Sequence, residues 1–151
     1  MFETTIGLIG AGATAAVCLF ALMVGEKIER IGAVANLMAW LVATLVLKSF
    51  GDEGQGNWFM LFIDLALLAT FAAIVWKAPR NWPVWACAFQ ILIVASQALI
   101  LSNFDTPLLS FYIVVNMSSF GILISIAVGT FMAWQERAAV GRGHDELGGY
   151  S

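Results

Sequence analysis

The sequence predicts an all-α integral membrane protein, built as a five-helix up-down transmembrane bundle with short loops. Of its 151 residues, 61% are hydrophobic and only 11% are charged, whereas an ordinary soluble domain is about 45–50% apolar and about 25% charged. Five long apolar runs alternate with short polar segments that carry nearly all of the charges. Because short connections make consecutive helices antiparallel neighbours, these runs predict one bundle over residues 1–133.

The first two predicted spans cover residues 6–24 and 31–47. Gly7, Ala11 and Ala15 recur at four-residue spacing along the first span. Small residues at this spacing let helix backbones approach closely in lipid, so these three are candidate helix-packing residues. The charged segment GEKIER between the two spans is interpreted as the first turn of the bundle.

The third predicted span, residues 58–76, begins and ends with Trp and contains an acid, Asp64. As a helix it would be about 27 Å long, close to the roughly 30 Å hydrocarbon core of a bilayer. Asp64 is the only charged residue of the chain well inside an apolar run. A charge within the bilayer is costly, so we expect Asp64 to face protein or a wet cavity.

The fourth and fifth predicted spans cover residues 84–101 and 108–133. The fifth is longer than a bilayer requires, which predicts a tilt or an extension past the interface. On the fourth span, Gln90 and Gln97 are seven residues apart and therefore share a face. Gln90, like Asn36 on the second span, is interpreted as structural, whereas Gln97 is assigned to a candidate polar cluster.

That cluster is expected inside the membrane, in the half nearer the outer face. The predicted topology brings one acid and three neutral polar residues to this half: Asp64, Asn116, Gln97 and Ser96. Asp64 would accept hydrogen bonds from the amides of Asn116 and Gln97. Such a cluster could carry a proton, bind a cation, or simply hold the helices together.

Small residues also line one face of the third span and one face of the fifth. They are candidate helix-packing positions for the same reason as those of the first span, and they are Ala66, Ala69, Ala73, Gly121, Ser125 and Gly129. Asp64 lies on the opposite face of the third span from its alanines. The third helix is therefore expected to lie centrally in the bundle, or to present one face to another subunit.

The basic residues predict the orientation. Segments 25–30, 77–83 and 134–151 lie on one side and hold every Lys and Arg except Lys48. The positive-inside rule then places the C-terminus in the cytoplasm and the N-terminus outside. Because Trp favours the boundary between water and lipid, five residues are candidate interface anchors: Trp58, Trp76, Trp82, Trp85 and Trp134.

Residues 134–151 are predicted to form a polar, Gly-rich cytoplasmic tail. A segment of this composition should be disordered alone, so a partner would be needed to order it. The candidate partner-binding residues of the tail are Arg142, His144, Asp145 and Tyr150.

Several classes of function lack the residues they need. No cofactor is expected, because the only His is in the tail and the three Lys flank the spans; this excludes an intramembrane haem ligand and a mid-membrane Schiff base. No metal site and no catalytic nucleophile–base pair is predicted. The net charge of −3 argues against nucleic-acid binding, which requires a basic face.

The sequence therefore favours a small non-catalytic integral membrane subunit or accessory protein of a larger complex or homo-oligomer. An alternative is a small proton- or cation-coupled transporter or channel that uses Asp64, and a weaker alternative is a holin-like pore former. The expected partners are the lipid bilayer and either another membrane protein or a second copy of the chain. The minimal loops favour a multi-pass protein of a prokaryotic inner membrane.

Overall fold

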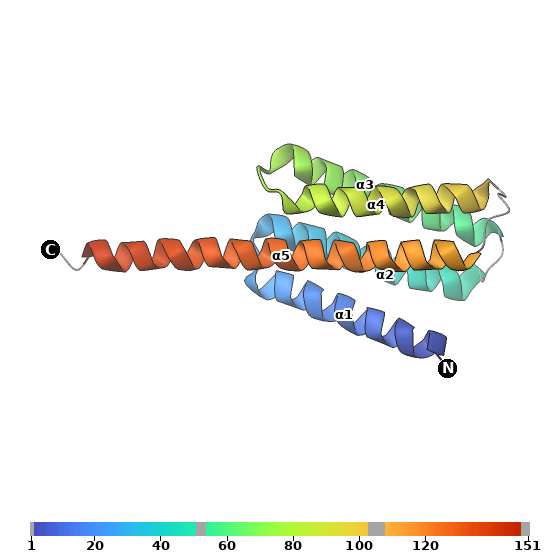
Figure 1. Cartoon of the computed structure of the whole chain (residues 1–151), viewed down its shortest axis with the longest axis horizontal. Coiled ribbons are helices and arrows are strands. Elements are labelled where there is room, and N and C mark those ends of the chain that lie inside the picture. The colour runs from blue at the N-terminus through green and yellow to red at the C-terminus, as the bar shows by residue number, and fades with distance from the viewer. Residues whose placement is uncertain (1, 51–53, 103–107, 149–151) are drawn as a thin grey trace.

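Five α-helices make up a computed structural model of the chain (Figure 1), which describes residues 2–50, 54–102 and 108–148. Side chains are described for these ranges except at residues 2–4, 6, 50, 54–56, 108 and 144–148. The helices are α1 (Phe2–Val24), α2 (Lys27–Phe50), α3 (Gly54–Lys77), α4 (Trp82–Leu101) and α5 (Leu108–Gly148). All five are long and apolar enough to cross a membrane, as fits a multi-pass membrane protein. The prediction of an all-helical chain with five such helices is confirmed.

The helices pack as a ring. Each helix contacts its neighbours in the chain, and α5 closes the ring against α1 while also touching α2. Figure 1 places the starts of α1, α3 and α5 and the ends of α2 and α4 at one end of the bundle, called the N-terminal end below. The connections α1–α2 and α3–α4 lie at the opposite, C-terminal end, where α5 projects beyond the other helices.

The turns at the C-terminal end are shorter than the sequence predicts. Only Gly25 and Glu26 separate α1 from α2, because α2 begins at Lys27. A side chain at Gly25 would bring a Cβ within 2.3 Å of the Ala21 carbonyl oxygen, so glycine allows the sharp reversal. The carboxylate of Glu29 reaches back to accept a 3.1 Å hydrogen bond from the Glu26 amide, as the acid of a capping box does.

Glycines of α5 let α4 approach closely, and this contact forms part of the core. A Cβ at Gly121 would lie 2.8 Å from the Phe89 ring, and a Cβ at Gly129 would lie 2.4 Å from the Trp82 indole. On its other side the same indole meets Gly32 of α2. Trp82 thus fills the space between α2 and α5, beside the buried Phe71.

Helix α5 continues through the segment that the sequence predicts to be a disordered tail. Its 41 residues correspond to about 60 Å, and its C-terminal part, beyond the bundle contacts of Glu136 and Arg137, projects past the other helices (Figure 1). The prediction of disorder rested on the overall Gly and polar content of the segment and overlooked the local run QERAAV. The residues Gln, Glu, Arg and Ala of this run are good helix formers. Arg142 is exposed on this extension, the side chains of His144 and Asp145 are not described, and Tyr150 lies outside the described residues.

Candidate functional site

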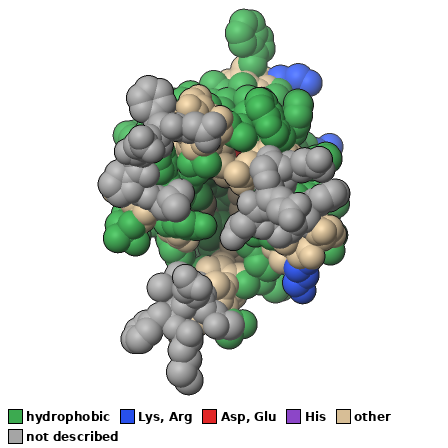
Figure 2. All heavy atoms as spheres, turned by 90° about the vertical axis from the view of Figure 1, so that its right-hand side faces the viewer, with side chains coloured by type: hydrophobic (Ala, Val, Ile, Leu, Met, Phe, Trp, Pro, Cys, Tyr) green, Lys and Arg blue, Asp and Glu red, His purple; other side chains and the backbone are tan. Residues whose placement is uncertain are grey.

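A cavity of about 610 Å³ lies inside the ring of helices, in the half of the bundle nearer the N-terminal end. All five helices contribute to its wall, from Thr14 on α1 to Leu123 on α5. Figure 2 looks onto the N-terminal end of the bundle and shows a hollow at the centre of that surface. Aliphatic side chains such as Leu67 and Ile93 form much of the wall, so its few polar groups are exceptions in a largely apolar surface.

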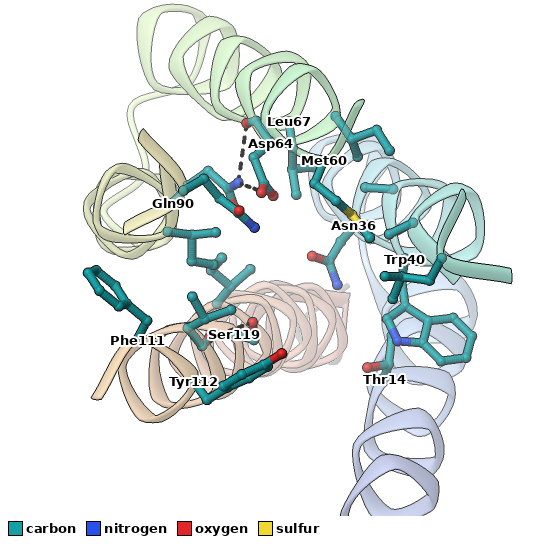
Figure 3. A pocket seen from close by; sticks show the side chains of 18 of the residues that line it. Thr14, Asn36, Trp40, Met60, Asp64, Leu67, Gln90, Phe111, Tyr112 and Ser119 are labelled. Atoms are coloured by element: carbon teal, nitrogen blue, oxygen red, sulfur yellow. Dashed lines mark hydrogen bonds between the residues drawn. The ribbon is translucent and has the colours of Figure 1, made fainter. Parts of the chain in front are cut away.

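Asp64 of α3 and Gln90 of α4 form the polar centre of this cavity. The Gln90 amide donates hydrogen bonds to the Asp64 side-chain oxygen Oδ1 at 3.1 Å and to the Asp64 carbonyl oxygen at 3.2 Å. Gln90 is fully buried, so this double contact fixes the position of the carboxylate. Gln97, two turns further along α4, also interacts with the Asp64 side chain, and Asn36 of α2 points into the cavity from the other side (Figure 3).

Among the described residues, the polar centre has a hydrogen-bond acceptor without a donor and a carboxylate without a counter-charge. Gln90 leaves its side-chain oxygen Oε1 buried and without a hydrogen-bond partner among the described residues. Every ion pair found in the described part of the chain involves Arg80 at the other end of the bundle, so none neutralises Asp64. A carboxylate in a low-dielectric site requires a counter-charge or a proton.

Aromatic side chains line the same cavity. Figure 3 shows Trp40 of α2 and Tyr112 of α5 on opposite sides of the gap between those helices, whereas Phe111, the residue before Tyr112, lies on the side of α5 that faces α4. Phe111 is buried, whereas Trp40 and Tyr112 are exposed at the surface of the bundle, at 39% and 63%. The cavity therefore reaches from a carboxylate and amides on α3 and α4 to aromatic rings on α2 and α5.

The structure brings together only part of the polar cluster expected from the sequence. Asp64 and Gln97 meet, but Gln90, interpreted as merely structural, is the main partner of Asp64. Asn116 is exposed and donates to the Tyr112 carbonyl oxygen at 2.8 Å, and Ser96 donates to the Leu92 carbonyl oxygen at 2.8 Å. Each of these side chains donates a hydrogen bond to a backbone carbonyl one turn earlier in its own helix, which is a common alternative to an interhelical bond.

The candidate packing residues also divide into two groups. Gly121, Ser125 and Gly129 are buried at the inner face of α5. The three alanines of α3 are exposed, as are Gly7 and Ala15 of α1, while Ala11 is half-buried. Helix α3 therefore turns one face to the cavity and its small-residue face outwards, so it is not surrounded by helices of its own chain.

A second polar site, which the sequence did not reveal, ties the C-terminal end together. Arg80, between α3 and α4, forms ion pairs with Glu26 at 3.0 Å, Glu29 at 3.3 Å and Glu136 of α5 at 3.3 Å. Glu29 is fully buried. The guanidinium of Arg137 of α5 also donates to the Val24 carbonyl oxygen at the end of α1. This group, Arg80 with its three glutamates, is called the Arg80 cluster below.

Trp82 belongs to the Arg80 cluster region rather than to the lipid boundary. It is 5% exposed, and its indole N–H donates to Glu29 at 3.2 Å. The sequence predicted an interface anchor here because Trp favours the boundary between water and lipid, but Gly32 and Gly129 leave room for the ring inside the bundle. The other four candidate anchors are exposed: Trp58, Trp76, Trp85 and Trp134.

The fold and the two polar sites fit a small multi-pass helical membrane protein that encloses a largely apolar cavity with a polar centre. Comparison of the chain with protein-family models, curated proteins and solved structures finds no match in any of the three. Its function therefore has to be inferred from the cavity, from the Arg80 cluster and from the exposed surfaces.

Proposed function

We propose that the protein binds a small solute in the cavity and carries it into or across the membrane, with Asp64 as the polar contact. The observation that carries this proposal is a carboxylate, held by a fully buried Gln90, that faces a cavity of about 610 Å³. Small-molecule sites are usually concave, largely apolar and about 300–1,000 Å³ in volume, with a few convergent polar groups. Intramembrane ionisable residues also mark solute and ion pathways.

The charge distribution supports an orientation for this site. The helix ends and turns at the C-terminal end of the bundle, together with the adjoining part of α5, carry every Lys and Arg of the chain except Lys48, which favours a cytoplasmic location for that end. The cavity would then lie in the half of the bundle nearer the outer face, where a solute could enter from outside the cell.

Transport can be tested without knowing the solute. Proteoliposomes would be incubated with a defined mixture of small amines, amino acids, carboxylates and sugars, and their contents measured by mass spectrometry. We expect at least one solute to enter faster than in protein-free liposomes. Ala43 lines the cavity, so the larger side chain of the Ala43→Phe variant would occupy part of the cavity and should abolish that uptake. Ala66→Phe, the same change on the exposed face of α3, should leave it intact.

Two results would count against this proposal. If no solute enters faster than in protein-free liposomes, the cavity has no transport role. Equal uptake by the Ala43→Phe and Ala66→Phe variants would show that uptake does not pass through the cavity. Circular dichroism and gel filtration of both variants in detergent establish that each one folds before uptake is compared.

A second candidate function is attachment to another membrane protein, as a small accessory subunit. It is favoured by the part of α5 that projects past the bundle, where the side chains of residues 139–143 are all exposed. Native purification of the full-length chain and of a chain truncated after Ala138, each followed by mass spectrometry, tests this function. A partner that is lost on truncation would support it, whereas a monomer with no associated protein in both preparations would exclude it.

A further inference from the structure

Resting on the proposed function, we infer the chemical class of the solute: an organic ammonium cation, which is an amine carried on an apolar body. The positive group would sit against Asp64, beside Gln90 and Gln97, and the apolar body would lie toward Trp40 and Tyr112. The inference rests on the charge, the volume and the aromatic wall of the cavity, taken in turn below.

The charge of the cavity selects a cation. Asp64 faces the cavity without a Lys or Arg partner among the described residues, because the ion pairs found there all involve Arg80. Gln90 and Gln97 give the carboxylate neutral amide contacts, which orient it but bring no positive charge. No Lys, Arg or His is among the described residues that line the cavity. A bound cation would balance the carboxylate in a site where water screens poorly.

The ligand set and the volume argue against an inorganic ion. A hard cation such as Ca²⁺ takes about six to eight oxygen ligands, and no group of three or more His, Cys, Asp or Glu that could hold a metal ion exists among the described residues. A cavity of about 610 Å³ is also much larger than a single ion needs. Its volume and its largely aliphatic wall fit a solute with an apolar body of its own.

The aromatic residues complete the match. Trp40 and Tyr112 line the side of the cavity formed by α2 and α5, and Phe111 lines it where α5 meets α4. Rings of this kind attract an ammonium group through their electron-rich faces, and they also pack against apolar carbon. A site that pairs one carboxylate with several aromatic rings therefore suits a cation of organic rather than mineral character.

Binding of two matched probes tests the inference. Phenethylammonium chloride and its neutral analogue 2-phenylethanol would be titrated calorimetrically into the protein in lipid nanodiscs, with empty nanodiscs as the blank. We expect the cation to bind at least tenfold more tightly than the alcohol. Asp64→Asn should remove that preference, and Asp64→Glu, which keeps the charge, should retain it. Glu136→Gln, which removes an exposed acid at the opposite end of the bundle, should bind like the unchanged protein.

The possible results separate this inference from the proposed function. Equal affinity for the two probes, or a preference for the cation that survives in Asp64→Asn, would overturn the ammonium assignment. Failure of both probes to bind would also overturn it. In each of these cases, uptake from the solute mixture that Ala43→Phe abolishes would leave the proposed function standing. Absence of any uptake would instead remove the proposed function itself.

Discussion

Replacing Glu29 by Gln should destabilise the bundle strongly, although the two side chains have nearly the same shape. Oxygen Oε1 of Glu29 accepts from the Trp82 indole at 3.2 Å and pairs with Arg80 at 3.3 Å, while Oε2 accepts from the Glu26 amide at 3.1 Å. An amide has one oxygen and one NH₂ group. Whichever way the new amide is turned, at least one of these donors faces another donor.

The size of the effect follows from the burial of Glu29. Leaving a buried donor unpaired costs about 1–3 kcal/mol, and breaking a buried ion pair costs about 3–5 kcal/mol. Because Arg80 keeps Glu26 and Glu136, we expect Glu29→Gln to lower the free energy of unfolding by about 2–4 kcal/mol. SDS titration of the protein in mixed micelles, followed by tryptophan fluorescence, measures this difference.

Glu136→Gln is the matched control, because it removes a carboxylate from the same Arg80. Its side chain is 67% exposed, against 0% for Glu29, and exposed ion pairs contribute about 0–1 kcal/mol. The two variants should therefore differ clearly in stability. An equal loss in both variants, or a loss below about 1 kcal/mol for Glu29→Gln, would refute the role assigned to burial.

Three further changes test the packing by the same SDS titration. Gly129→Ala places a Cβ 2.4 Å from the Trp82 indole and should lower the free energy of unfolding by about 1–3 kcal/mol. Gly141→Ala is its control, because Gly141 has open space around it, and this change should cause no loss of stability. An equal loss of stability in both variants would contradict the close α4–α5 contact. Ala73→Leu, on the exposed face of α3, should change stability by less than about 0.5 kcal/mol, and a larger loss would mean that this face packs in the monomer. Truncation after Ala138 should leave the unfolding midpoint unchanged, and a lower midpoint would show that the projecting part of α5 supports the bundle.

The helices were predictable because their signal is local. Each apolar run is long enough to cross a bilayer, and neither its length nor its composition depends on contacts elsewhere in the chain. The cost of a charge in lipid likewise predicted that Asp64 needs polar neighbours. The sequence chose Gln97 over Gln90 from its predicted depth in the membrane, but the partners that Asp64 has also depend on the rotation of each helix about its axis.

The Arg80 cluster was missed because its members are distant in sequence and look like ordinary turn residues. The contact between Trp82 and Glu29 joins positions 53 residues apart, and nothing local shows that one turn folds onto the other. Two features did carry information. Glu29 follows Glu26 at the spacing of a capping box, and Pro83 stands in the first turn of α4, where proline favours a helix start.

The two ends of the bundle are held by different interactions, and this difference bears on where a solute could enter. At the C-terminal end, Arg80 and Arg137 connect α1, α2, α5 and the turn before α4 through charged and backbone groups. At the N-terminal end, Gly7, Gly10 and Gly12 of α1 have open space where a side chain would be. Separating α1 from its neighbours there would break none of the ion pairs described above. The cavity lies in the half nearer the N-terminal end, so a solute that enters from that end would not have to pass the Arg80 cluster.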